Sequence, residues 1–274
     1  MAAGKSDGCS PIVSMDRLIL FSDLDGTLIF SAKRKQVGDI VIERKDGEPI
    51  SCVTSRQAEL LRGLANIIPV TTRSVEQYRR IDFAALGFSP EYALCDNGGT
   101  LLVNGEIDAA WSAWSLEIVR ECADELARFR ELLEHDPRRS FEVRLVDGLF
   151  LFTKSADPNG TLAYPGKSEL CECCATGEKV YVIPRELNKG AAVRRLAKRL
   201  GLREFAAAGD SFMDISMLNT ANIAIFPEDI AKALPALSRP NGLPADARPK
   251  YPKVRHTHSR EGFPEFVTEF ADKL

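Results

Sequence analysis

Short apolar runs alternate with segments of helical periodicity over most of the chain. Each apolar run stops at a cluster of polar residues, which is typical of a strand buried on both faces of a parallel sheet. Between the runs, apolar side chains recur at helical spacing, with Thr54 or Ser55, Asn188 and Gly201 at favoured cap positions. Strands separated by helices predict a doubly wound parallel sheet. The predicted strands are 18–21, 66–70, 92–95, 204–208 and 222–226, and the predicted helices are 55–64, 75–86, 188–200 and 262–274.

The pattern changes between residues 108 and 185. A helical pattern over 115–134 precedes an alternating segment at 141–145 and apolar runs at 149–152 and 179–183, an order typical of antiparallel strands. Residues 156–166 contain Asp157-Pro158-Asn159-Gly160 and are predicted to form a loop. The predicted fold class is therefore α/β, with a doubly wound, Rossmann-like parallel-sheet core and an inserted α+β domain.

The predicted domain organisation follows from this change of pattern. Residues 1–14 are expected to be a flexible leader, 15–107 and 186–274 the core, and 108–185 the insert. Within the core, 39–43 and 50–53 flank Asp46-Gly47, a favoured turn pair, and predict a hairpin. We expect this hairpin to lie as a flap beside the end of the first strand. The proline-rich segment 235–252 is predicted to be a loop.

Composition argues against several classes of partner. The 274 residues carry a net charge of −3 and only short basic clusters, which gives no electrostatic basis for binding nucleic acid. No apolar run approaches the roughly 18 residues of a membrane span, and the N-terminal segment lacks the apolar region of a secretory signal. The seven cysteines are expected to be reduced thiols in a cytoplasmic protein. No feature indicates an obligate protein partner.

Polar residues of complementary chemistry follow the predicted strands. Asp23 and Asp25 come directly after the first strand, where buried carboxylates are costly unless a ligand compensates them. Ligands of open parallel sheets bind at the carboxyl ends of the strands. We expect the same edge to receive four further side chains, which are Thr71, Lys189, Asp210 and Asp214.

Several carboxylates, one lysine and one hydroxyl suit a phosphate site with a divalent cation. Mg²⁺ prefers carboxylate oxygens, water and a phosphate oxygen. Lys189, at the start of a predicted helix, adds a positive charge and free backbone N–H groups, and both favour phosphate. One carboxylate can be the nucleophile in phosphoryl transfer and a second can move the proton, provided that cations offset the repulsion between the anions.

The segment Asp23-Leu24-Asp25-Gly26-Thr27 resembles the D-x-D-G-T signature of the haloacid dehalogenase-like hydrolases. Thr71, Lys189 and Gly209-Asp210 with Asp214 resemble the second, third and fourth motifs of that superfamily, in the same order. The insert resembles the large cap of the Cof-like and sucrose-phosphatase-like branch. In that branch Thr-Gly-Arg and Glu-Asn-Gly are usual, and the corresponding segments here are Thr71-Thr72-Arg73 and Asp96-Asn97-Gly98.

The resemblance implies a role for each matching residue. Asp23 is expected to be the nucleophile and a Mg²⁺ ligand, and Asp25 the general acid/base with its backbone carbonyl on the metal. Arg73 and Asn97 are candidates for contact with the substrate. The remaining metal ligands are Asp210 and Asp214, the latter directly or through water, and the phosphate-binding residues are Thr71, Thr72 and Lys189.

Other residues admit two interpretations. Cys171, Cys173 and Cys174 are either solvated thiols or a metal or redox site, and their spacing is too tight to supply the four ligands of structural zinc. Trp111 and Trp114 belong either to the core or to a sugar site. The basic residues that are either surface charges or substrate contacts are Arg73, Arg144 and Lys154.

The leading functional hypothesis is a Mg²⁺-dependent phosphatase for a small phosphorylated metabolite, preferentially a sugar phosphate. The reaction would pass through an aspartyl-phosphate, and the cap would select the substrate. Two alternatives stay open: a phosphohexomutase of the same superfamily, and a non-catalytic regulator that binds sugar phosphates. Asp25 argues against the regulator, because binding alone does not need a second carboxylate.

Overall fold

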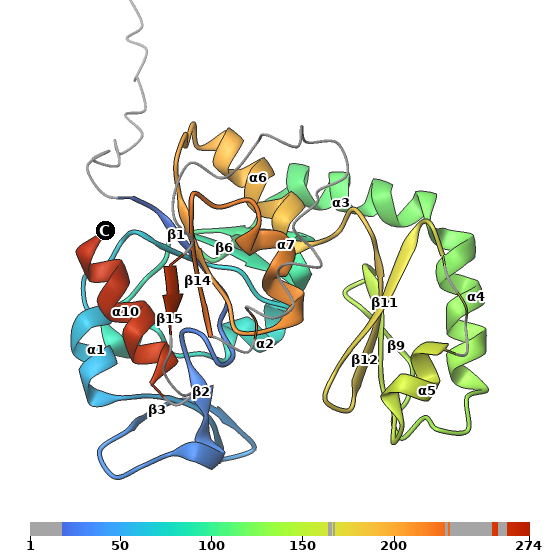
Figure 1. Cartoon of the computed structure of the whole chain (residues 1–274), viewed down its shortest axis with the longest axis horizontal. Coiled ribbons are helices and arrows are strands. Elements are labelled where there is room, and N and C mark those ends of the chain that lie inside the picture. Colours follow the sequence, from blue (N-terminus) through green and yellow to red (C-terminus); the bar gives the residue numbers. More distant parts are fainter. Residues whose placement is uncertain (1–17, 164–165, 167, 228–229, 231–253, 257–261) are drawn as a thin grey trace, which may run out of the picture.

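A five-stranded parallel sheet forms the core of the protein (Figure 1). The computed structural model describes residues 18–163, 166, 168–227, 230, 254–256 and 262–274, so the predicted leader 1–14 and loop 235–252 lie outside the described residues. The order β15-β14-β13-β1-β5 places β1 between two parallel neighbours. The strands are β1 (Leu20–Ser22), β5 (Ile67–Pro69), β13 (Ala206–Ala208), β14 (Ile223–Pro227) and β15 (Val254–His256).

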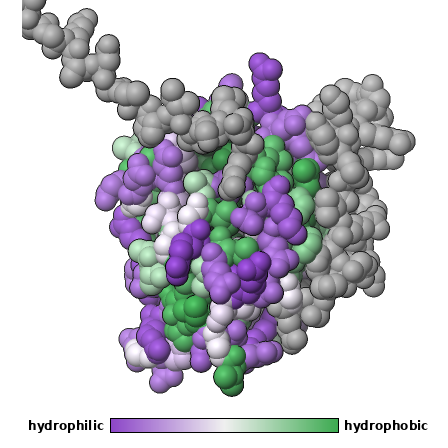
Figure 2. Space-filling model, turned by 90° about the vertical axis from the view of Figure 1, so that its left-hand side faces the viewer, coloured by the Kyte–Doolittle hydropathy of each residue, from purple (hydrophilic) through white to green (hydrophobic). Residues whose placement is uncertain are grey.

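Helices cover both faces of this sheet, because successive side chains of a strand point to opposite faces. Leu20 packs with α1 (Ser55–Leu61) and α10 (Phe263–Lys273). Phe21, the next residue, packs with α6 (Lys189–Arg199) and α7 (Ile215–Leu218). Hydrophilic and hydrophobic side chains are interspersed on the outer surface of the side that carries α1 and α10 (Figure 2). The doubly wound α/β core predicted from the sequence is confirmed.

Two small antiparallel sheets adjoin the core. The predicted flap hairpin is β3 (Ile40–Lys45) and β4 (Glu48–Val53), extended by β2 (Phe30–Ser31). The other sheet is β6 (Tyr92–Cys95), β7 (Thr100–Val103) and β8 (Glu106–Ile107). The prediction that 92–95 is a strand of the parallel sheet is wrong in one respect: its ladder partner is β7, and a single parallel bridge between Val70 and Leu94 links it toward β5.

The inserted segment folds around a four-stranded antiparallel sheet in the order β11-β12-β10-β9. Helices α4 and α5 lie on the side of this sheet away from the core (Figure 1). Helix α3 connects the two parts: Trp111 is buried in the core, while Ile118 packs on the inserted sheet. The elements are α3 (Ala109–Glu121), α4 (Ala123–Glu134), β9 (Arg144–Val146), β10 (Phe150–Lys154), α5 (Pro158–Ala163), β11 (Cys171–Thr176) and β12 (Lys179–Pro184).

Helix boundaries differ from the sequence-based prediction in three places. The single helix predicted at 115–134 begins earlier and is divided at Cys122 into α3 and α4. The helix predicted at 75–86 ends as α2 (Val75–Arg79), with a separate 3₁₀ turn at Ala84–Leu86. A helix, α5, replaces the loop predicted at 156–166, because proline is tolerated in a first helical turn.

No helix in the described part of the chain is long and apolar enough to span a bilayer.

The expectation that Cys171 and Cys174 are solvated thiols is wrong. Both lie on β11, a strand that the sequence analysis missed, and their exposed fractions are 1% and 6%. The run Cys171-Glu172-Cys173-Cys174 contains no β-branched or aromatic residue, so it carries none of the usual signals of a strand. The tertiary packing of the insert, rather than local propensity, makes this segment extended.

Candidate active site

Three buried carboxylates meet at the carboxyl edge of the parallel sheet. Asp23 follows β1, Asp210 follows β13, and Asp214 closes the 3₁₀ turn Phe212–Asp214 just beyond it. Each offers an oxygen, and these three oxygens lie within 4.8 Å of one another. The structure therefore brings together the three side-chain carboxylates that the resemblance assigns to the metal.

Local geometry holds these carboxylates in place. Gly26 has φ +89°, and a Cβ there would lie 2.4 Å from Asp210 Oδ2, so the turn after β1 requires glycine. Thr27 Oγ1 donates a hydrogen bond to Asp210 Oδ1 at 3.4 Å. The N–H and hydroxyl of Ser211 donate to Asp214 Oδ2 at 3.0 and 2.7 Å. The glycine and threonine of the first motif thus support an aspartate of the fourth.

One buried cation lies among the carboxylates. Lys189, with 1% of its surface exposed, begins α6, where the side chain of Asn188 caps the helix. Its Nζ donates to Asp23 Oδ1 at 2.5 Å and to Asp214 Oδ1 at 2.6 Å. Burial disfavours a charged lysine, but Asp214 and Asp23 outweigh this effect and raise the pKa of Lys189 above its usual range. The start of α6 therefore supplies a permanent positive charge to the site.

The charge balance of this cluster suits a divalent cation. Three carboxylates and one ammonium leave two negative charges in excess. Burial, followed by the negative charge of Asp214, raises the pKa of Asp23 well above its usual range in spite of Lys189. A divalent cation would remove this excess, and Mg²⁺ prefers carboxylate oxygens. The chemistry and spacing of the three carboxylates therefore fit Mg²⁺.

Asp25 pairs with Arg73 rather than with Lys189. Nε and Nη2 of Arg73 donate to the two carboxylate oxygens of Asp25, each at 2.7 Å. Partial desolvation by the surrounding residues would raise the pKa of this acid, but the bonds to Arg73 outweigh this effect and hold the pKa of Asp25 below its usual range. The Asp25 side chain is 55% exposed, whereas that of Arg73 is 10% exposed. The interpretation of Arg73 as a surface charge is therefore wrong.

The flap supplies further partners of Arg73, among them Glu43. Arg73 Nη1 donates to Glu43 Oε2 at 2.9 Å, and Glu43 also accepts from Ser51 Oγ at 2.6 Å and Arg80 Nε at 3.2 Å. Glu43 is 2% exposed, and the pairing of β3 with β4 shifts on both sides of it, as at a β-bulge. The sequence analysis missed Glu43, because nothing in the run 40–43 signals a bulge that buries an acid.

The loops after β5 and β6 complete this edge. Thr71 Oγ1 accepts from the N–H of Arg73 at 3.1 Å, and the N–H of Asn97 donates to the Thr71 carbonyl at 2.9 Å. Asn97 Nδ2 donates to the carbonyl of Leu187, just before α6, at 3.0 Å. Thr72 is half-buried between Thr71 and Arg73. Asn97 thus joins the proposed phosphate-binding threonines to the segment that carries Lys189.

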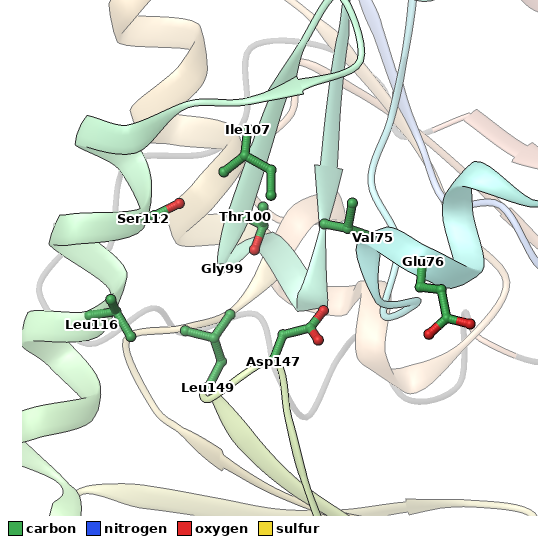
Figure 3. Close-up of a pocket in the computed structure, with 9 residues that line it drawn as sticks. All are labelled: Val75, Glu76, Gly99, Thr100, Ile107, Ser112, Leu116, Asp147 and Leu149. Atoms are coloured by element: carbon green, nitrogen blue, oxygen red, sulfur yellow. The ribbon is translucent and has the colours of Figure 1, made fainter.

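A hollow of about 270 Å³ lies between α2, β7, α3 and the turn joining β9 to β10 (Figure 3). Its lining contains two carboxylates, Glu76 and Asp147, and no basic side chain, so it does not suit a phosphate. The buried Lys189 ammonium therefore suits a phosphate better than this hollow does. The lining residues are Val75, Glu76, Gly99, Thr100, Ile107, Ser112, Leu116, Asp147 and Leu149.

Asp96, in the loop that leads to this hollow, is buried beside Thr100 and Asp147. Burial outweighs a hydrogen bond with Thr100 and, with a smaller effect of Asp147, raises the pKa of Asp96 to about 8. Between about pH 4 and pH 8, Asp96 is therefore protonated in the folded protein but ionised in the unfolded chain, where its pKa has the ordinary value of 3.8. Consequently, this group makes the protein less stable as the pH rises from about 4 to about 8.

We expect Asp96→Asn to raise the free energy of unfolding by about 1–3 kcal/mol at pH 8, and by less at pH 5. Asparagine keeps the shape, removes the charge and tolerates the φ of +54° at this position. Urea denaturation at the two pH values measures the effect. Asp272→Asn, at an exposed position of α10, is the control and should change little. An equal gain at both pH values would contradict the proposed titration.

Comparison with known proteins connects this site with a family. The model of the haloacid dehalogenase-like hydrolase family matches residues 169–228, which include Lys189, Asp210 and Asp214. A phosphoglycolate phosphatase from Methanothrix thermoacetophila is 26% identical over 157 residues. The match covers 56% of this chain and 65% of the length of that relative.

Solved structures share the fold over nearly the whole chain. The sucrose-phosphatase of Synechocystis sp. PCC6803, in complex with sucrose and phosphate, superimposes with a TM-score of 0.62 at 17% identity, covering 93% of this chain and 98% of that one. A trehalose-6-phosphate phosphatase related protein gives 0.51 at 17% identity, covering 92% and 96%. The chain therefore shares the fold of these phosphatase structures, and its segment 169–228 is similar to the haloacid dehalogenase-like hydrolase family.

Proposed function

We propose that this protein is a Mg²⁺-dependent phosphatase for a small phosphorylated metabolite, preferentially a sugar phosphate. The observation that carries this proposal is the buried Lys189 ammonium between Asp23 and Asp214. This arrangement places a carboxylate that can act as the nucleophile beside a fixed cation, as phosphoryl transfer requires. The names of the phosphoglycolate phosphatase and sucrose-phosphatase relatives support the same reaction class.

Asp23 and Asp25 share the covalent steps. Asp23 attacks the phosphorus while the bond to the leaving oxygen breaks, and Asp25 gives that oxygen its proton. Water then attacks the aspartyl-phosphate, Asp25 takes a proton from the water, and phosphate leaves Asp23. Throughout, Lys189, Thr71 and Thr72 hold the phosphate oxygens.

The metal site would be formed by the side chains of Asp23, Asp210 and Asp214 with the backbone carbonyl of Asp25. Bound Mg²⁺ supplies positive charge that offsets the repulsion between the Asp23 carboxylate and the phosphate. Ser211 and Thr27 orient two of these carboxylates through the hydrogen bonds described above.

Arg73 has to release Asp25 during this cycle. The bidentate pair keeps Asp25 ionised, which is the form that takes a proton from water in the second step. Donation in the first step requires the protonated form, which the pair opposes. The incoming phosphate is an anion and can compete with Asp25 for the guanidinium. This exchange would make Arg73 a substrate contact, with Asn97 supporting the adjoining loop.

The insert and the thiols bear on two further parts of the proposal. We propose that residues 108–185 act as a cap that selects the substrate, because Cys174 of their sheet contacts Met213, the residue before Asp214. We also propose a reducing compartment, the cytoplasm, because the six described cysteines are free thiols.

A phosphatase screen tests the proposed function. We expect phosphate release from at least one sugar or glyceryl phosphate in the presence of Mg²⁺, because the metal offsets the charge of the carboxylates. Chelation by EDTA should reduce the rate at least about a hundredfold, and excess Mg²⁺ should restore it. Product analysis with glucose 1-phosphate separates hydrolysis from transfer, since a mutase would yield glucose 6-phosphate. No release from any substrate of the panel would contradict the proposal.

A further inference from the structure

The four-stranded sheet of the insert, β11-β12-β10-β9, is called the cap sheet below. One of its faces is directed toward the catalytic residues. Side chains alternate along a strand, so Lys179 and Tyr181 of β12 share a face with Phe152 and Lys154 of β10. Val182, which points the other way, packs with α4 on the outer side. The face with the two lysines is therefore the inner face of the cap sheet.

A sulfur contact fixes this inner face beside the metal cluster. Cys174 pairs with Tyr181 across β11 and β12, and its Sγ lies 3.3 Å from Met213 Sδ. Met213 immediately precedes Asp214, one of the three clustered carboxylates. Lys179 is two residues along β12 from Tyr181, a distance of about 7 Å for an extended chain.

Two lysines stand opposite each other on this face. Lys154 of β10 is the direct cross-strand partner of Lys179 of β12. Like charges at such a pair destabilise a sheet. Among the described residues neither lysine has an ion-pair partner: Arg73 occupies the nearby Asp25, and Arg144 occupies Glu142, which lies just before β9. An arrangement that costs stability and leaves two cations uncompensated favours an anionic ligand.

The surroundings of the lysines suit an organic phosphate. The rings of Phe152 and Tyr181 lie 5.4 Å apart, and that of Phe141 lies 5.9 Å from Phe152, which gives the face an apolar floor. Lys154 Nζ is 6.0 Å from the Phe141 ring.

We propose that Lys154 and Lys179 bind a second anionic group of the substrate. The enzyme would then prefer phosphate monoesters that also carry a carboxylate or a second phosphate. This inference rests on the proposed function, because it places the transferred phosphate at Asp23 and the remainder of the substrate against the cap sheet.

Matched substrate pairs test the proposal. We expect kcat/KM to be at least about tenfold higher for 3-phosphoglycerate than for glycerol 3-phosphate, or for glucose 1,6-bisphosphate than for glucose 6-phosphate. The first pair reports on a carboxylate and the second on a phosphate. In Lys154→Met/Lys179→Met the preference should fall to within about twofold of unity, and Lys154→Arg/Lys179→Arg should retain most of it. Lys198→Met, at the exposed far end of α6, is the matched control.

Equilibrium binding separates this proposal from the proposed function. Calorimetric titration of the Asp23→Asn protein with the same four compounds should show the same preference, again lost in the double methionine variant. If the wild-type protein hydrolyses none of them but binding retains the lysine-dependent preference, the phosphatase proposal fails and the anion subsite stands. Equal kcat/KM values within both pairs, or a preference unchanged by the double methionine substitution, would overturn the subsite.

Discussion

Asp23→Asn should lower the rate of phosphate release by at least about 10³-fold, corresponding to about 4 kcal/mol of transition-state stabilisation. The amide removes the nucleophile and weakens one oxygen ligand of the proposed metal site. It also removes a buried negative charge. Burial and Asp214 raise the pKa of Asp23 well above its usual range, so the wild-type carboxylate is destabilised where it lies. We therefore expect the variant, without Mg²⁺, to be as stable as the wild type or more stable.

This combination of outcomes distinguishes a catalytic from a structural aspartate. Hydrolysis of p-nitrophenyl phosphate in Mg²⁺ measures the activity, and thermal unfolding in EDTA measures the stability. Asp124→Asn, at an exposed position of α4, is the matched control and should leave both unchanged. Activity within tenfold of the wild type in a clean preparation would rule out Asp23 as the nucleophile. Loss of activity with a large drop in stability would point to misfolding.

The sequence was sufficient to predict the parallel sheet and the edge at which its site lies. Local signals were strong there: short apolar runs ended at polar residues, and Asn188 capped the helix that begins at Lys189. Because parallel strands share one carboxyl edge, Asp23 and Asp210 had to lie near each other once the topology was known. The close approach of Gly26 to Asp210 and the hydrogen bond from Thr27 to Asp210 show why the motif extends past its aspartates.

The network around Asp25 could not be predicted in the same way. Its bidentate partner, Arg73, follows another strand, and Glu43 enters through a bulge in the flap. A one-residue change of register would turn Glu43 to the opposite face, and register depends on packing rather than on the local pattern. The pairing of the two lysines in the cap could not be predicted either, because Lys154 and Lys179 become opposite neighbours only when β10 pairs with β12.

Lys189→Met should abolish turnover and also destabilise the protein by about 3–5 kcal/mol in the absence of Mg²⁺. Methionine fills a similar volume, but Asp23 Oδ1 and Asp214 Oδ1 lose the ammonium that donates to them at 2.5 and 2.6 Å. Both carboxylates would remain buried without this cation. Since a divalent cation can take over part of its charge, Mg²⁺ should stabilise the variant more than it stabilises the wild type.

Urea denaturation at pH 7, in EDTA and in Mg²⁺, measures this difference. Lys198→Met is again the control, because it removes the same charge from the exposed end of the same helix. If Mg²⁺ partly reverses the destabilisation of Lys189→Met, the ammonium and the metal neutralise the same carboxylates. A variant as stable as the wild type in EDTA would mean that the buried acids are protonated in the free protein, and that Lys189 serves the bound phosphate rather than the fold.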